Sequence, residues 1–318
     1  MNIPNNLQTI AIFGLAKNTG KTTTLNALIE RHKDQSLALT SIGLDGELYD
    51  QINFLPKPQI HCPKGTIIAT SKSTLNDRSD YKILKETNLQ TALGPIVIIE
   101  THIASHYLIA GPTSNEDLRK LLAMLKPLAE KIFIDGALNR KTFTQLSMID
   151  GLILATGASV ARTMEETINL TNHIVQLFTL SGIDKDHNYP YKVALINDSE
   201  KTYYQTKSLA VIKQSLIANA EVYIKGAITD SIIDTVLKHA KAPLKIIAED
   251  PSKWLFNLKK LDYLAQKEIQ LSVIHAVKLL FITINPTHPS GIDYPKEAFK
   301  KTLQETLNIP VYNVLEGT

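Results

Sequence analysis

The sequence predicts an α/β protein with a mainly parallel sheet flanked by helices, followed by a smaller C-terminal α/β domain. Three observations support this fold class. Short apolar segments alternate with amphipathic helical segments, the first apolar segment leads through a glycine-containing loop into a helix, and the alternation restarts after about residue 200. Strands that are apolar on both faces and are joined by helices are typical of parallel sheets covered on both sides.

The first part of the chain begins with an apolar strand at 9–13, and a helix at 22–33 carries Leu25, Leu28 and Ile29 on one side. The further elements expected there are strands at 36–43, 95–99, 131–134, 151–155 and 193–196 and helices at 115–129 and 161–180.

In the second part, we expect strands at 221–224, 244–248 and 311–315 and helices at 230–239, 251–267 and 296–307. The apolar run 269–284 is too long for one ordinary strand, so we expect two strands that meet near Val277 or Lys278. The expected domains are therefore 1–204 and 205–318.

The composition excludes several classes of protein. The 318 residues are 44% apolar and 20% charged, which is ordinary for a globular protein. The net charge of +3 contains no block of like charge, so we expect neither a nucleic-acid nor a membrane partner. Cys62 is the only cysteine, which excludes an intrachain disulfide, and no apolar run is long enough to span a bilayer. These features predict a cytoplasmic protein.

The loop Gly14–Thr22 (GLAKNTGKT) has the form of a phosphate-binding loop, or P-loop. Backbone N–H groups of such a loop converge on phosphate oxygens, and the following helix directs its positive end at the same anion. We expect Gly20 to allow close approach of the backbone, Lys21 to reach the β- and γ-phosphates, and Thr22 to place its hydroxyl on Mg²⁺. The expected nucleotide contacts are Gly14, Lys17, Asn18, Thr19, Gly20, Lys21, Thr22 and Thr23. These assignments predict a P-loop NTPase.

Five residues separate Gly14 from Gly20, whereas the usual pattern has four, and Leu15 occupies the expected glycine position. This longer loop resembles that of dethiobiotin synthetase and its relatives, in the P-loop branch that also contains the Min-type ATPases and the nickel-insertion GTPases. The signature lysine of the Min-type enzymes falls on Ala16, and Lys17 comes one position later. Lys17 is thus either a phosphate contact or a solvated loop lysine.

Three carboxylates follow apolar strands directly, where an open parallel sheet binds its ligands. They are Asp45, Glu100 and Asp135. Mg²⁺ takes few protein ligands, so one or two of these beside Thr22 would complete its site. We prefer Asp45 and Glu100, and expect either one to orient the ion or the attacking water while Lys21 stabilises the transferring phosphoryl group. For each carboxylate, a helix cap or turn is the alternative.

The choice of base favours ATP. A GTP-specific protein would show Asn-Lys-x-Asp after a late strand, but Asn197–Glu200 reads NDSE and lacks the lysine. Asn197 either bonds a base edge, as a comparable asparagine does in dethiobiotin synthetase, or belongs to a turn. His102 and His106 are four residues apart and would share one face of a helix, as metal-binding pairs often do. A role in a loop is the stronger interpretation.

Several further segments resemble the P-loop reactivase subunit that accompanies adenosylcobalamin-dependent lysine 5,6-aminomutase and ornithine aminomutase. They are Ser41–Glu47 (SIGLDGE), Gly65–Thr70 (GTIIAT), Asp135–Arg140 (DGALNR), Ile153–Ala158 (ILATGA) and Thr283–Pro286 (TINP). The first four, with the loop, lie within the first 200 residues.

The resemblance implies a chaperone-like ATPase whose change of shape releases damaged cobalamin from the mutase. Its expected partners are the aminomutase and a companion reactivase subunit, and a homodimer is a further candidate. Two alternatives stay open. One is an ATP-dependent small-molecule ligase or kinase related to dethiobiotin synthetase. The other is a GTP-driven metal-insertion protein, against which the lack of a clustered Cys/His site argues.

Overall fold

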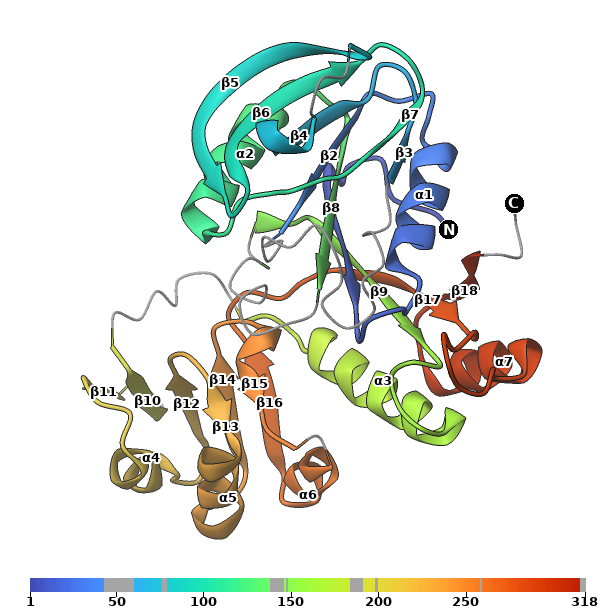
Figure 1. Cartoon of the computed structure of the whole chain (residues 1–318). Helices are drawn as coiled ribbons and strands as arrows, with labels where there is room; N and C mark the ends of the chain where they lie inside the picture. Colours follow the sequence, from blue (N-terminus) through green and yellow to red (C-terminus); the bar gives the residue numbers. More distant parts are fainter. Residues whose placement is uncertain are drawn as a thin grey trace. The chain divides into compact units, whose positions relative to one another are not determined.

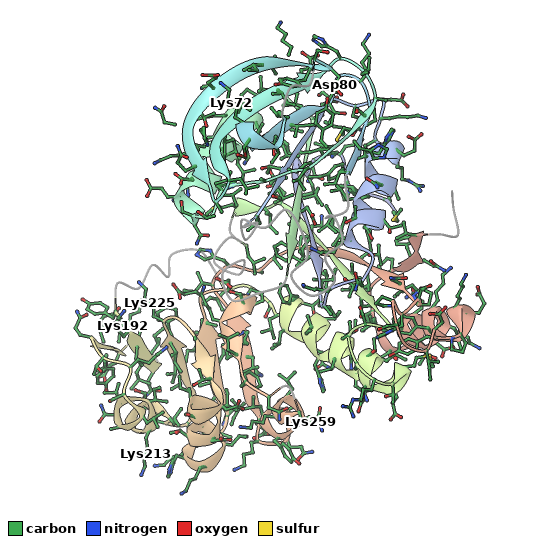
Figure 2. All side chains as sticks on the ribbon, viewed as in Figure 1. Lys72, Asp80, Lys192, Lys213, Lys225 and Lys259 are labelled. Carbon is green, nitrogen blue, oxygen red and sulfur yellow. The ribbon has the colours of Figure 1, made fainter. Side chains whose placement is uncertain are left out.

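The structure is a computed structural model that describes residues 1–42, 60–75, 79–137, 146, 148–183, 191–197, 200–257 and 259–314. It divides into two compact units (Figure 1). Unit 1 comprises Met1–Ile168 and Leu279–Thr318, and unit 2 comprises Asn169–Lys278. Charged side chains such as Lys72 in unit 1 and Lys213 and Lys259 in unit 2 are exposed (Figure 2).

Unit 1 is built on a nine-stranded sheet of order β18-β17-β9-β1-β8-β2-β4-β6-β5. Its strands in chain order are β1 (Thr9–Gly14), β2 (Leu37–Ser41), β4 (Ile67–Ser71), β5 (Tyr81–Thr91), β6 (Gly94–Thr101), β8 (Lys131–Ala137), β9 (Gly151–Gly157), β17 (Leu279–Asn285) and β18 (Val311–Asn313). All neighbours from β18 to β4 are parallel, and only β6 and β5 run antiparallel to their neighbours. The expected mainly parallel sheet is therefore present.

Helices α1 (Lys21–Arg31), α2 (Asn115–Leu125) and α7 (Lys296–Thr306) belong to unit 1, and α3 (Met164–Phe178) contains the division between the units. α1 buries Leu25, Leu28 and Ile29 on the face that packs against β1 and β8. α2 begins at Ser114, whose hydroxyl accepts the amide of Asp117 at 3.0 Å, as an N-cap serine does. A separate two-stranded antiparallel sheet consists of β3 (Ile60–Cys62) and β7 (Ser105–Tyr107).

The N-terminal segment of unit 1 is fixed by a buried lysine. The Lys131 Nζ donates to the carbonyls of Pro4 at 3.1 Å, Asn5 at 3.2 Å and Leu7 at 2.6 Å. Burial lowers the pKa of Lys131, because the charged form loses its hydration. These three bonds compensate part of that loss.

Unit 2 has its own five-stranded sheet of order β11-β10-β12-β14-β16 and its own apolar core. The strands are β10 (Val193–Asn197), β11 (Glu200–Tyr204), β12 (Ala220–Ile224), β14 (Leu244–Ala248) and β16 (Ile269–Val273), with a small pair formed by β13 (Ile228–Thr229) and β15 (Trp254–Leu255). The helices are α4 (Leu209–Ser215), α5 (Asp230–His239) and α6 (Lys260–Gln266). β12, β14 and β16 are parallel, whereas β10 is antiparallel to both of its neighbours.

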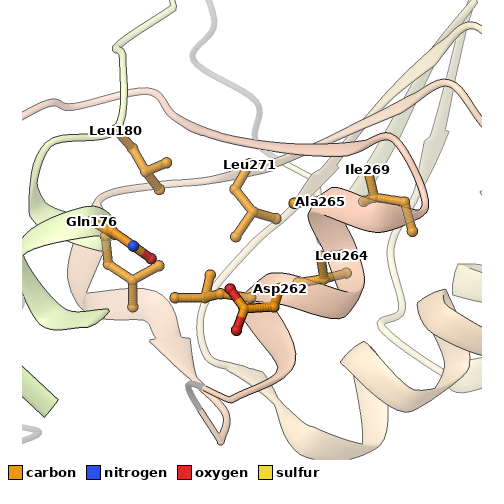
Figure 3. Close-up of a pocket in the computed structure, with 9 residues that line it drawn as sticks. Gln176, Leu180, Asp262, Leu264, Ala265, Ile269 and Leu271 are labelled. Atoms are coloured by element: carbon orange, nitrogen blue, oxygen red, sulfur yellow. The ribbon is translucent and has the colours of Figure 1, made fainter. Parts of the chain in front are cut away.

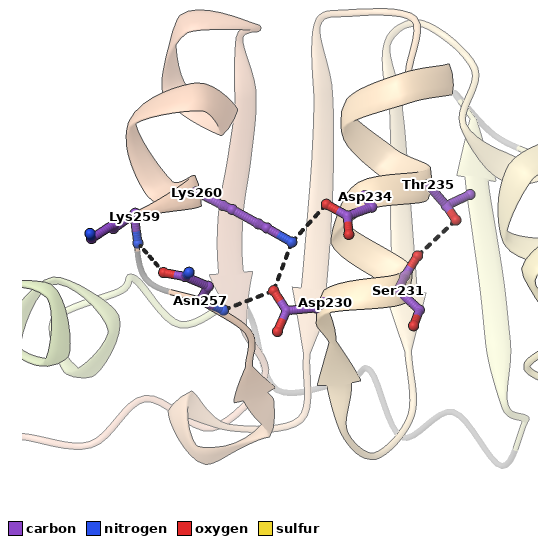
Figure 4. A network of polar contacts seen from close by, with 7 residues as sticks. All are labelled: Asp230, Ser231, Asp234, Thr235, Asn257, Lys259 and Lys260. Carbon is purple, nitrogen blue, oxygen red and sulfur yellow. Dashed lines mark hydrogen bonds and ion pairs between the residues drawn. The ribbon is translucent and has the colours of Figure 1, made fainter.

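A charged network joins α5 to α6 in unit 2 (Figure 4). The Lys260 ammonium lies 2.7 Å from both the Asp230 and the Asp234 carboxylates. Asp230 also accepts the backbone amide of Asn257 at 3.0 Å. These contacts lower the pKa of Asp230 and raise that of Lys260. They lie at the surface, so we regard them as fixing geometry more than adding stability.

The division of the chain differs from the expected boundary near residue 204. The run 269–284 does contain two strands, β16 and β17, but they enter different sheets. β17 pairs with β9, so residues 279–318 return to unit 1 instead of completing a domain from 205 to 318. The expected strand at 193–196 likewise becomes β10 of unit 2. An apolar run shows that a strand is buried, but not which sheet buries it.

No helix in the described ranges is both long and apolar enough to cross a membrane.

Candidate nucleotide-binding site

The loop Gly14–Thr22 lies at the carboxyl end of β1, between the ends of neighbouring strands. The amide of Leu15 donates to the Ala155 carbonyl of β9 at 2.9 Å, and the Ser159 hydroxyl, which follows β9, donates to the Lys17 carbonyl at 2.6 Å. On the next strand, the Asn285 side-chain amide donates to the Asn18 carbonyl at 2.7 Å. The ends of β9 and β17 therefore hold the loop in place.

Two backbone positions turn the loop into α1. Asn18 and Gly20 both have positive φ, 60° and 84°, and Gly20 is the N-cap residue. Positive φ is accessible to glycine at little cost, whereas other residues adopt it rarely. Gly20 supplies no capping side chain, so the first amides of α1 point outward as donors for an anion.

The side chain of Lys21 folds back over the end of β1. A Cβ atom on Gly14 would lie 2.8 Å from the Lys21 Cδ and 2.5 Å from the Thr19 Oγ1, so any larger residue would displace them. The Lys21 Nζ lies 3.6 Å from the Asp135 Oδ1. The lysine therefore lies between the loop and the end of β8.

Asp135 brings a carboxylate to this site from β8, the neighbour of β1. Its Oδ1 is buried and has no hydrogen-bond partner among the described residues. Burial raises the pKa of Asp135, and the Lys21 ammonium opposes this rise. A buried carboxylate oxygen that faces the Lys21 ammonium at 3.6 Å has the chemistry of an acidic Mg²⁺ ligand.

Of the remaining predicted loop residues, Thr19 is buried, Lys21 and Thr22 are partly buried, and Lys17, Asn18 and Thr23 are exposed. The Thr19 hydroxyl donates to the Ala16 carbonyl at 3.1 Å, within the loop. The exposed position of Lys17 is compatible with either of its two interpretations. Asp45, the other preferred carboxylate, lies outside the described residues.

Glu100 does not belong to this site, which corrects the sequence interpretation. β6 runs antiparallel to β4, and Glu100 pairs with Ile67 at the amino end of β4. The carboxyl end of β4, at Ser71, pairs instead with Ile96. Glu100 therefore lies at the edge of the sheet opposite the loop, and it cannot share an ion with Thr22.

Asn197 belongs to unit 2. It ends β10 in unit 2, where it pairs with Glu200 of β11 and with Ala220 of β12. Within unit 1, the strand next to β9 is β17, and this strand ends at Asn285. The asparagine that the structure brings to the loop is therefore Asn285, which the sequence analysis placed only within a family resemblance. An asparagine followed by proline after an apolar strand was the available signal.

A second contact from β17 supports the start of α1. The hydroxyls of Thr24 and Thr283 are 2.8 Å apart and buried, and the Thr24 hydroxyl also lies 3.0 Å from the Gly20 carbonyl. Because Thr24 has one proton and gives it to Gly20, Thr283 donates to Thr24. The amide of Ala158 donates to the Asn285 carbonyl at 2.9 Å. β17 thus contributes to the site through both its side chains and its backbone.

One cavity of about 280 Å³ lies in unit 2 and is not part of this site (Figure 3). It is lined mainly by leucines of α3, α6 and β16, and Asp262 is the only ionisable residue among the lining residues. A few convergent polar groups usually orient a small ligand in its pocket. The arrangement around this cavity does not point to a phosphate ligand.

No model of a known protein family matches the chain, and no curated protein matches it. Among solved structures, the chain is similar to pNOB8 ParA in a structure of that protein bound to nonspecific DNA. The identity is 11%, the alignment covers 93% of this chain and 91% of that chain, and the TM-score is 0.30. We base neither fold nor function on a similarity at this level.

Proposed function

We propose that unit 1 binds and hydrolyses a nucleoside triphosphate, with ATP as the preferred substrate. The observation that carries this proposal is the position of Lys21, folded over Gly14 and 3.6 Å from Asp135 at the N-terminus of α1. The amides of the loop would hold the β-phosphate, and Lys21 would neutralise charge that develops on the transferring group. Its pairing with Asp135 directs the ammonium toward the end of β8.

Mg²⁺ fits the site through Thr22 and Asp135. When bound, the ion would supply positive charge that stabilises the phosphate oxygens. The Oδ1 of Asp135, which lies 3.6 Å from the Lys21 Nζ and has no closer hydrogen-bond partner among the described residues, would give the ion or one of its waters an acceptor, and the Thr22 hydroxyl is the expected direct ligand. Asp45 stays a proposed third contributor on the sequence alone: β2, which precedes it in the chain, ends at the same edge of the sheet as the loop.

ATP is favoured over GTP because neither candidate asparagine begins a guanine motif. The strand end that lies beside the loop reads Asn285–His288 (NPTH), which has neither the lysine nor the aspartate of Asn-Lys-x-Asp. We therefore expect hydrolysis of ATP to exceed that of GTP at equal concentration.

Release of phosphate by the purified full chain tests this function. We expect release that depends on Mg²⁺ and is lost in Lys21→Ala. The matched control is Lys33→Ala, because Lys33 lies just beyond the other end of α1, is exposed and pairs only locally with Glu30. Equal rates in the parent and in Lys21→Ala would refute the assignment of the site.

We further propose that hydrolysis serves to exchange damaged cobalamin in an adenosylcobalamin-dependent aminomutase. The support is the resemblance of the sequence blocks named above, of which Gly65–Thr70 overlaps β4 and Ile153–Ala158 overlaps β9. Unit 2 carries its own core but its sequence has no second glycine-rich phosphate loop, as expected of a part that contacts a partner.

The test incubates an inactivated aminomutase with fresh adenosylcobalamin, ATP, Mg²⁺ and this protein, with and without a companion subunit. Recovery of mutase activity that fails with Lys21→Ala would support the reactivase function. If no mutase recovers, and ATP is consumed only when a small acid or amine is added, the ligase or kinase function replaces it. Both outcomes leave the nucleotide site itself intact.

A further inference from the structure

Two histidines from distant parts of the sequence face each other across the β3–β7 sheet. His61 pairs directly with His106 in the antiparallel register, between the pairs Ile60–Tyr107 and Cys62–Ser105. Ile60, Cys62 and Tyr107 are buried, whereas both histidines are exposed. Side chains alternate between the faces of a strand, so the two imidazoles share the outer face. His102 and His106 do not share the face of a helix, because β7 begins at Ser105.

The spacing of the two rings is that of two ligands of one metal ion. Their centroids lie 5.0 Å apart, with an angle of 57° between the ring planes. A metal–nitrogen bond of about 2.0–2.1 Å places each ring centroid roughly 3.2 Å from the ion. Two such rings at a tetrahedral angle have centroids about 5.2 Å apart, and at a right angle about 4.5 Å apart. The observed separation falls between these values.

The backbone that carries the pair is held from a third element. The amide of His61 donates to the Asn26 side-chain oxygen of α1 at 3.2 Å, and β3 packs against α1. Directly opposed residues in an antiparallel pair keep their Cβ atoms at nearly constant distance. The two rings are therefore held side by side on one face of the β3–β7 sheet.

We propose that His61 and His106 form a binding site for a late first-row divalent transition metal ion such as Ni²⁺, Cu²⁺ or Zn²⁺. Imidazole nitrogen suits these ions, whereas Mg²⁺ prefers oxygen, so the site is chemically separate from the one at Lys21. In the described parts of the chain, no group of three or more His, Cys, Asp or Glu side chains gathers to hold a metal. Water molecules or a ligand from a partner protein would complete the coordination, and the bound ion would link β3 to β7.

The test is a calorimetric titration of the full chain, without an affinity tag and without nucleotide, with NiCl₂. We expect a single ion per chain. Loss of even an outer-shell partner of a metal ligand costs about 10–100-fold in affinity, so His61→Ala and His106→Ala should each weaken binding by more than about tenfold. Both side chains are exposed, so the folded structure should tolerate these changes.

The matched control is His102→Ala, an exposed histidine close to His106 whose backbone amide, not its ring, bonds the Asp80 carbonyl at 2.8 Å. This variant and Lys21→Ala should bind Ni²⁺ as the parent does. With Cu²⁺, electron paramagnetic resonance should show nitrogen couplings that disappear in either single variant. Undiminished Ni²⁺ binding by both His61→Ala and His106→Ala, or no saturable binding by the parent, would overturn the proposal.

Discussion

The contact between Gly157 and Asn285 can be tested by adding one methyl group. In Gly157→Ala, the new Cβ would lie 2.2 Å from the Asn285 carbonyl oxygen and 3.0 Å from its carbonyl carbon. These are backbone atoms, so no side-chain rotation relieves the clash. Asn285 must withdraw by roughly 1 Å, as overpacked cores do when the backbone shifts.

The withdrawal removes two hydrogen bonds that join β17 to the loop region. They run from the Ala158 amide to the Asn285 carbonyl and from the Asn285 side-chain amide to the Asn18 carbonyl. Each contributes about 0.5–1.5 kcal/mol, and overpacking costs about 1–3 kcal/mol, so we expect a loss of about 2–6 kcal/mol. For a unit of this size, a loss of 3 kcal/mol lowers Tm by about 6–12 °C.

Nucleotide affinity should fall as well, because the loop loses its support from Asn285. Holding the loop in its binding conformation without the bond from Asn285 would cost about the free energy of one hydrogen bond. This cost would weaken affinity by roughly threefold to tenfold. Thermal melting and a titration with ATP and Mg²⁺ measure the two effects.

The matched control is Gly151→Ala at the other end of β9. Its new Cβ would meet the Leu280 Cδ1 at 2.9 Å and the Ile10 Cδ1 at 3.3 Å, which are ends of movable side chains far from the loop. We expect a smaller loss of Tm and unchanged affinity. A Gly157→Ala variant with the parental Tm and the parental affinity would refute the reasoning.

Three further substitutions test the charges and bonds of unit 1. Burial raises the pKa of Asp135, so the parent loses stability as the pH rises from the ordinary aspartate pKa to that raised value. Asp135→Asn should therefore melt at or above the parental Tm at pH 7 without ligand, yet lose the effect of Mg²⁺ on phosphate release. Thr283→Val removes the donor to Thr24 and should lower the free energy of unfolding by about 1 kcal/mol in urea. Because the pKa of Lys131 is lowered in the folded state, the unfolded chain binds more protons than the folded chain as the pH approaches 10.5. The stability of the parent should therefore rise with pH more than that of Lys131→Met. Thermal melting at several pH values measures this difference.

The centre of the site was predictable because its signals are local. An apolar strand, a glycine-containing turn and an amphipathic helix stand next to each other in the sequence, and they form β1, the loop and α1. Asp135 was found for a related reason, since it lies near the end of an apolar strand that becomes the neighbour of β1.

The direction of β6 was not predicted, and the predicted position of Glu100 beside the loop was therefore wrong. No element was expected at residues 81–91, which are mostly polar or charged. They form the long exposed strand β5, and only two residues separate it from β6. So short a connection joins antiparallel strands, whereas parallel strands need a crossover of a dozen or more residues.

The contribution of β17 could not be predicted for a different reason. Thr24 and Thr283 bond across a separation of 259 residues, and Asn18 and Asn285 across 267. Such contacts depend on which sheet a strand joins after the chain has passed through unit 2. Apolar periodicity reports burial but contains no information on the partner strand.

Binding of ATP in the presence of Mg²⁺ shows whether the loop Gly14–Thr22 holds a nucleotide. In isothermal titration of the full chain, we expect a single saturable site whose affinity for ATP rises with Mg²⁺. Lys21→Ala should lose most of this binding, while Lys33→Ala should bind as the parent does. Identical isotherms for the parent and Lys21→Ala, or no ATP binding by the parent, would contradict the account.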